Sequence, residues 1–160
     1  MWLSAGPRRV DDRVARDRDS VRFVIAGKSA ADRFGCASAA RTFARKVGLS
    51  PKRSEELAIV ASELASNVIR HADSGALELR YAAEPKPHVL MVCRDRGPGI
   101  ADLDEARKDG YSCGRVLSPD ALRHEGLGHG LGAVERLVDE LQIESVVGVG
   151  TTIVLKKWIP

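Results

Sequence analysis

The sequence predicts an α/β fold, a two-layer sandwich (α+β) in which a mixed, mostly antiparallel sheet carries its helices on one face. Short runs rich in β-branched and apolar residues indicate strands, and long stretches with apolar residues at helical spacing indicate helices. Their order along the chain is a strand, two helices, two strands, a glycine-rich loop, a helix and two strands. A chain of 160 residues is long enough for one domain with its own core.

Composition and charge restrict the class of protein. The chain is 44% hydrophobic and 29% charged, with a net charge of +3 and interspersed acids and bases, which favours neither nucleic acid nor a membrane surface as a partner. It shows no signal-peptide pattern and no apolar stretch long enough to cross a membrane, so we expect a cytoplasmic protein. Three scattered cysteines without a CxxC pair predict reduced thiols rather than a zinc site or disulfides.

The first 20 residues are dense in Arg and Asp and poor in large apolar side chains. Such a segment buries too little surface to offset the entropy lost on ordering. We therefore expect a flexible charged arm over residues 1–20 and one folded domain over residues 21–160.

A strand is expected over residues 21–26, followed by Gly27-Lys28-Ser29. A phosphate-binding P-loop also ends in Gly-Lys-Ser, but it needs a glycine five positions before that Gly-Lys pair. Arg22 occupies this position, so we interpret Gly27-Lys28 as a turn.

Two helices are predicted next. Residues 31–48 repeat apolar side chains at helical spacing, and Gly48 is a suitable stop. Ser50 and Pro51 then supply an N-cap and a first-turn proline for a second helix, which we expect to run to about Ala72.

The remaining strands form two pairs. Residues 76–82 alternate apolar and polar side chains, and residues 88–95 are more apolar, so we expect a half-buried strand joined by a hairpin to a central one. Residues 142–147 and 151–158 form a second pair around a glycine turn. The helix before that pair is expected to bury Leu131, Val134, Leu137 and Leu141.

Three polar residues share one stripe of the second helix. Glu63, Asn67 and His71 are four residues apart, so their side chains lie one turn above each other. The other faces of this helix are apolar enough to be buried. The stripe is either a solvated helical face or part of a binding site.

Asp95-Arg96-Gly97-Pro98-Gly99 ends the predicted central strand. A carboxylate at a strand end can accept hydrogen bonds from an amino group of a ligand, and glycines let the backbone come close. Pro-Gly is also typical of a tight turn, so this motif alone leaves both interpretations open.

The segment from Gly126 to Gly132 opens a helix with alternating glycines. Exposed N–H groups at a helix N-terminus form a ready anion site, although such a run is equally typical of a flexible loop. The spacing does not fit the dinucleotide pattern G-x-G-x-x-G, which excludes a Rossmann site.

These three motifs are followed by Gly150-Thr151-Thr152. With the four motifs in this order, the sequence resembles the Bergerat-fold (GHKL) ATPases, the superfamily of the nucleotide-binding domains of gyrase, Hsp90, histidine kinases and MutL. The resemblance covers about residues 21–158. Within that superfamily the chain is most similar to the RsbT-type and anti-sigma-factor serine kinases of bacterial partner-switching pathways. The resembling segments are residues 62–67, 95–100, 109–112, 126–128, 132–140 and 150–153.

The resemblance implies an ATP-dependent protein serine/threonine kinase that uses Mg²⁺. It implies that Glu63 orients or deprotonates the incoming hydroxyl and that Asn67 is the metal ligand. Asp95 would accept a hydrogen bond from the adenine amino group, helped through water by Thr151 or Thr152. The glycines implied at the nucleotide are Gly97 and Gly99 at adenine and Gly126, Gly128 and Gly130 at the phosphates.

The implied substrate is a small STAS-domain antagonist, with a sigma factor or a downstream phosphatase as further partners. Two alternatives stay open: an anti-sigma factor that sequesters a sigma subunit, and a nucleotide-sensing interaction module without transfer chemistry. Residues 113–125, in the segment that corresponds to the ATP lid, are longer than in the RsbT-type pattern. Nucleotide closure and partner contact are therefore where this chain is expected to differ from that group.

Overall fold

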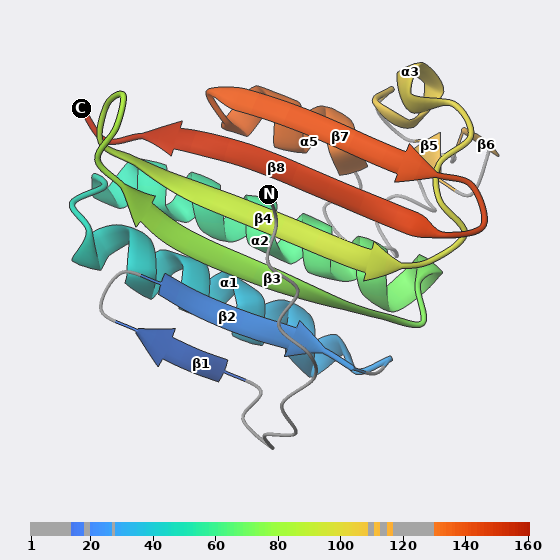
Figure 1. Ribbon diagram of the computed structural model, residues 1–160, viewed down its shortest axis with the longest axis horizontal. Helices are drawn as coiled ribbons and strands as arrows, with labels where there is room; N and C mark the ends of the chain where they lie inside the picture. The colour runs from blue at the N-terminus through green and yellow to red at the C-terminus, as the bar shows by residue number, and fades with distance from the viewer. Residues whose placement is uncertain (1–13, 18–19, 27, 109–110, 113–114, 117–129) are drawn as a thin grey trace.

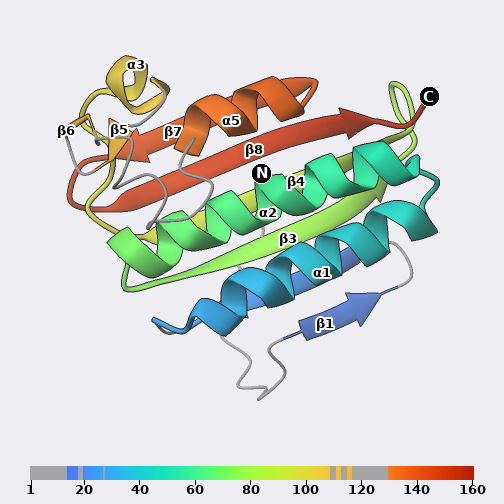
Figure 2. The ribbon, with the colours of Figure 1, turned by 180° about the vertical axis from the view of Figure 1, so that it is seen from behind.

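A computed structural model describes residues 14–17, 20–26, 28–108, 111–112, 115–116 and 130–160. Six strands form one sheet in the order β1-β2-β3-β4-β8-β7. The three longer helices lie on one face of this sheet (Figures 1 and 2). The predicted two-layer α/β architecture is confirmed, and every pairing in this sheet is antiparallel rather than mixed.

The structure gives these bounds for the elements. The strands of the large sheet are β1 Val14–Asp17, β2 Ser20–Ile25, β3 Ser74–Ala82, β4 His88–Arg96, β7 Glu140–Val146 and β8 Gly150–Trp158. The helices on its face are α1 Ala30–Lys46, α2 Pro51–His71 and α5 Gly130–Leu137. The remaining short elements are α3 Leu103–Ala106 and the pair β5 Tyr111–Ser112 and β6 Arg115–Val116.

Serine caps fix the starts of the two long helices. The side chain of Ser29 accepts a hydrogen bond from the N–H of Ala31, and that of Ser50 accepts one from the N–H of Arg53. Each cap satisfies a backbone donor that has no partner within its helix. The predicted Ser50 cap and first-turn Pro51 are confirmed.

The core lies between the helices and the inner face of the sheet. Alternate residues of the central strands point toward the helices, which is the pattern that an antiparallel sheet with one covered face requires. Fully buried side chains of β3, β4, β8 and α2 include Leu77, Leu79, Met91, Leu155, Leu57, Val60 and Leu64. This packing anchors α2 and leaves the stripe of Glu63, Asn67 and His71 on another side of the helix.

Two predicted boundaries are wrong. Residues 14–17, expected in the flexible arm, form β1 because they pair with the edge of β2. Leu141, expected on the stripe of the last helix, lies in β7. The helix ends at Leu137, and the N–H of Asp139 donates to the carbonyl of Lys156 over 3.0 Å, which directs the chain into the sheet.

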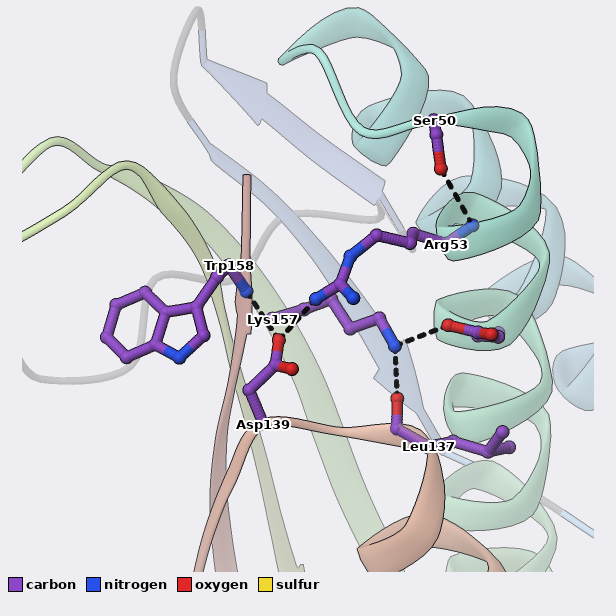
Figure 3. Close-up of polar contacts among 7 residues, drawn as sticks. Ser50, Arg53, Leu137, Asp139, Lys157 and Trp158 are labelled. Atoms are coloured by element: carbon purple, nitrogen blue, oxygen red, sulfur yellow. Dashed lines mark hydrogen bonds and ion pairs between the residues drawn. The ribbon is translucent and has the colours of Figure 1, made fainter. Parts of the chain in front are cut away.

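A buried polar cluster ties the start of α2 to the end of α5 and to β8 (Figure 3). Lys157 is 3% exposed, and its Nζ lies 2.6 Å from Oε2 of Glu56 while it also donates to the carbonyl of Leu137. Beside it, the guanidinium of Arg53 pairs with Asp139. These contacts hold the end of α2 that is farthest from His71.

Two of the three cysteines lie in the core as thiols. Cys36 and Cys93 are buried, and burial raises the pKa of Cys36 to about 12, so the thiol stays protonated. Cys113 lies outside the described residues. Among the helices that the structure describes, none is long and apolar enough to cross a membrane.

Candidate functional site

Asp95 lies near the end of β4, half-buried beside the start of β8. The backbone N–H of Thr151 donates to its Oδ1 over 3.2 Å. Burial raises the pKa of Asp95, while hydrogen bonds from the backbone of Thr151 and Gly97 and the nearby His71 act in the opposite direction. The carboxylate is therefore held in place and only partly hydrated, as an acceptor for a ligand's amino group should be.

The C-terminal end of α2 lies against the loop that follows β4. A Cβ atom added to Gly97 would lie 3.1 Å from the Cβ of Ala72, so any side chain there would crowd the helix end. The N–H of Asp73 donates to the carbonyl of Arg96 over 3.0 Å. The same added Cβ at Gly97 would lie 3.0 Å from Oδ1 of Asp95, so the C-terminal end of α2, where the polar stripe ends, lies close to that carboxylate.

Glu63 and Asn67 precede His71 on the same stripe. Glu63 is 8% exposed and Asn67 is half-buried, so neither lies on a fully solvated helix face. Helix α5 packs beside α2 (Figure 2), with Leu131 and Val134 in the shared core. Helix α5 therefore covers part of α2, the helix that carries the polar stripe.

Gly130 is the first residue of α5 and has a φ of +51°, a left-handed conformation that favours glycine. An added Cβ would meet no atom of the described residues within 4 Å. The N-terminal N–H groups of α5 lack partners within the helix and form its positive end. Gly126 and Gly128 and most of residues 113–125 lie outside the described residues.

Two glycines allow a close approach of backbone segments. Gly99 has a φ of +72°, and a Cβ there would lie 2.4 Å from the carbonyl oxygen of Val146. Gly150 has a φ of +150°, and its Cβ would lie 2.2 Å from the carbonyl oxygen of Asp95. The loop after β4 and the β7–β8 hairpin come together because neither position carries a side chain.

The structure distinguishes the two candidate threonines. Thr151 is 6% exposed and shares the inner face with Ile153 and Leu155. Successive strand residues point to opposite faces, so the side chain of Thr152 lies on the outer face, paired across strands with Arg94 and Glu144. Only Thr151 is brought to Asp95.

Two polar residues, one beside Thr151 and one at the C-terminal end of α2, were not predicted from the sequence. The Oγ of Ser145 accepts a hydrogen bond from the N–H of Ile100 over 2.7 Å and lies 2.9 Å from Oγ1 of Thr151. The Nζ of Lys28 donates to the carbonyl of Ala72 over 3.2 Å, where it complements the negative end of α2. Lys28 was not predicted because the Gly27-Lys28 pair was interpreted only as a turn. Ser145 could have been noticed as a polar residue at a position of its strand where the alternation of side chains points inward.

The described residues can be tested for their fit to a nucleotide with Mg²⁺. No group of three or more His, Cys, Asp or Glu side chains in that part of the chain is arranged to hold a metal ion. Mg²⁺ that binds with a nucleotide needs no such group, since it commonly takes one or two protein oxygens, phosphate oxygens and water. Asn67 offers one such oxygen.

Comparison with known proteins gives a consistent result. Residues 30–157 match the histidine kinase-like ATPase domain family. The chain is 32% identical over 120 residues to the serine/threonine-protein kinase RsbT of Bacillus subtilis (strain 168), covering 74% of this chain and 83% of that protein. It is 32% identical over 108 residues to the anti-sigma F factor of Priestia megaterium, covering 65% of this chain and 69% of that protein.

A solved structure shares the fold. The blue-light activated histidine kinase EL346 of Erythrobacter litoralis superposes with a TM-score of 0.50 at 19% identity. The match covers 81% of this chain and 41% of that one, so this chain spans less than half of the larger kinase. At this identity the similarity concerns the fold alone.

Proposed function

This chain belongs to the histidine kinase-like ATPase domain family, and on that premise we propose that it is an ATP-dependent protein serine/threonine kinase. One observation supports this proposal most directly. Asp95, which accepts a hydrogen bond from the N–H of Thr151, lies close to the end of α2, the helix whose polar stripe includes Glu63 and Asn67. Residues 21–160 would form the kinase domain, with residues 14–17 adding an edge strand to its sheet.

In the proposed complex, Asp95 accepts a hydrogen bond from the adenine 6-amino group and Gly97 leaves room for the base against the backbone. Asn67 contributes its side-chain oxygen to Mg²⁺. Bound Mg²⁺ supplies charge neutralisation at the phosphates. The N-terminus of α5 at Gly130, together with Gly126 and Gly128, provides N–H donors for the phosphate oxygens.

Glu63 is proposed as the residue that orients or deprotonates the acceptor hydroxyl. It lies one helical turn from Asn67 and is largely buried, so its carboxylate faces a restricted environment rather than bulk water. A positioned base of this kind contributes about 100-fold to 10,000-fold to proton-transfer catalysis.

The proposed substrate is a small STAS-domain antagonist of a bacterial partner-switching pathway, in the cytoplasm. The similarity to RsbT supports this class of substrate, and a sigma factor or a downstream phosphatase would be further partners. The similarity to anti-sigma F factors supports a second candidate function, in which the chain sequesters a sigma subunit.

The kinase proposal is tested by incubating the protein with ATP, Mg²⁺ and candidate STAS-domain proteins and measuring intact masses. The parent should add phosphate to one partner, and Glu63→Gln should slow transfer by about 100-fold or more while ATP still binds. Glu55→Gln is the matched control, since Glu55 lies on the same helix and pairs with Arg41 at the surface. It should transfer at the parent's rate.

Each alternative has its own outcome. Bound ATP with no phosphate on any partner would contradict the kinase proposal and leave a nucleotide-sensing interaction module. Co-purification with a sigma subunit that survives Glu63→Gln would support the anti-sigma function, and failure to bind any sigma subunit would count against it.

A further inference from the structure

A serine outside the recognised motifs joins the groups around Asp95. Ser145 is half-buried on β7, where it pairs directly with Thr151 of β8. Its Oγ accepts a hydrogen bond of 2.7 Å from the N–H of Ile100, in the loop after β4. The same oxygen lies 2.9 Å from Oγ1 of Thr151 and 3.3 Å from the carbonyl oxygen of Gly150. Ser145 therefore links the loop after β4 to β8, the strand whose Thr151 donates to Asp95.

The Ser145 hydroxyl has a single proton and two acceptors within reach. The 2.9 Å separation from Thr151 lies within the usual range of O–H···O hydrogen bonds, whereas 3.3 Å to Gly150 exceeds it. Either oxygen can donate across the shorter contact, and when Ser145 donates there it gives up only the longer, weaker contact with Gly150. Thr151 then accepts from Ser145 and keeps its own O–H for another acceptor.

Thr151 also holds the carboxylate through its backbone. Its N–H donates to Oδ1 of Asp95, so Thr151 both fixes the Asp95 carboxylate and places its own hydroxyl beside that carboxylate. Adenine has a complementary edge, with the 6-amino donor next to the N1 acceptor, whereas guanine has an acceptor followed by a donor. A donating Thr151 hydroxyl beside Asp95 therefore matches adenine and not guanine.

We propose that Ser145 is a positioning residue for base recognition: by donating its proton to Thr151, it leaves the Thr151 hydroxyl to donate toward N1 of adenine, directly or through a water. Asp95 accepts from the 6-amino group at the same time. This inference rests on the ATP binding proposed above. Without the Ser145 hydroxyl, the Thr151 proton has no fixed direction and the contribution of N1 is lost.

The test measures affinities by calorimetry for ATP, for 1-deaza-ATP, in which carbon replaces N1, and for purine riboside triphosphate, which lacks the 6-amino group. The parent should bind 1-deaza-ATP about tenfold more weakly than ATP, as expected for one hydrogen bond. Ser145→Ala should bind ATP about tenfold more weakly than the parent does and show no further loss with 1-deaza-ATP. Ser145→Ala should still lose affinity when the ligand lacks the 6-amino group. Ser145→Thr, which keeps a hydroxyl, should again bind 1-deaza-ATP more weakly than ATP.

Two further variants separate positioning from stability. Ser54→Ala removes another buried serine, whose Oγ donates to the carbonyl of Leu49 at the opposite end of α2, and should leave both penalties unchanged. Thr151→Val keeps the shape and the backbone N–H of Thr151 and should abolish the N1 penalty even if Ser145→Ala does not fold.

The outcomes are distinguishable. A full N1 penalty in Ser145→Ala overturns the inference, and so does a parent that binds ATP without any N1 penalty. A parent that binds no ATP overturns the proposed function itself.

Discussion

At the scale of single residues, the site depends on backbone segments that approach more closely than side chains allow. Gly150 combines a φ of +150° with a position where a Cβ atom would lie 2.2 Å from the carbonyl oxygen of Asp95. Gly148, in the same hairpin, also has a positive φ, but an added Cβ there would meet no atom within 4 Å in the part of the chain that the structure describes. A side chain at Gly148 would therefore cause backbone strain alone, whereas one at Gly150 would cause both backbone strain and steric overlap.

Gly150→Ala is expected to reduce the free energy of unfolding by about 2–4 kcal/mol, because strain and overlap act together. Gly148→Ala should cost only about 1 kcal/mol, from the left-handed backbone alone. Urea unfolding of both variants measures the difference. Equal losses would show that the close approach of Gly150 to Asp95 does not limit stability.

Single residues also show where prediction from sequence stops. The position of Asp95 at a strand end followed by glycines was predictable, because local motifs define it. The sequence left Thr151 and Thr152 as alternatives, since only the phase of the strand against its neighbours decides which one faces Asp95. Ser145 was missed because its contact with Ile100 joins residues 45 positions apart.

At the scale of elements, α2 positions the polar stripe and is held at both ends. Its C-terminal end contacts the loop at Gly97, and its N-terminal part is tied to α5 and β8 by Lys157 and Glu56 (Figure 3). A buried ion pair adds little net stability by itself, but removing one partner leaves a charge without compensation.

Lys157→Met is expected to lower the free energy of unfolding by about 2–3 kcal/mol, somewhat below the loss for a fully buried pair because Glu56 is 22% exposed. The double variant with Glu56→Gln should recover part of this loss. Lys156→Met is the matched control: Lys156 pairs with Glu140 on the outer face and should cost less than about 1 kcal/mol. Similar losses in both single variants, measured by urea unfolding, would contradict the role of the cluster.

The elements differ in how far local sequence defines them. Helices α1 and α2 begin and end within two residues of their predicted bounds, because caps and apolar periodicity are local signals. The end of α5 was missed because the contact of Asp139 with Lys156 depends on β8. Strand β1 was missed for a similar reason, since it pairs with the free edge of β2.

At the scale of the whole molecule, the sheet order brings distant motifs together. β4 lies between β3 and β8, so the end of β4 meets the start of β8 while α2 crosses the same face. Asp95 and Thr151 are 56 positions apart in the chain and share a hydrogen bond. The order of the motifs along the sequence predicted the fold through its resemblance to a known superfamily, whereas the contacts between them required the structure.

The central claim is that Asn67 and Asp95 serve one nucleotide, and titration calorimetry with ATP, with and without Mg²⁺, tests it most directly. Asn67→Ala should lose the gain in affinity that Mg²⁺ gives the parent. Asp95→Ala should bind ATP about 10-fold to 100-fold more weakly under both conditions, as expected for a lost hydrogen bond to a charged group. Both variants binding ATP as the parent does, with the same dependence on Mg²⁺, would contradict the account.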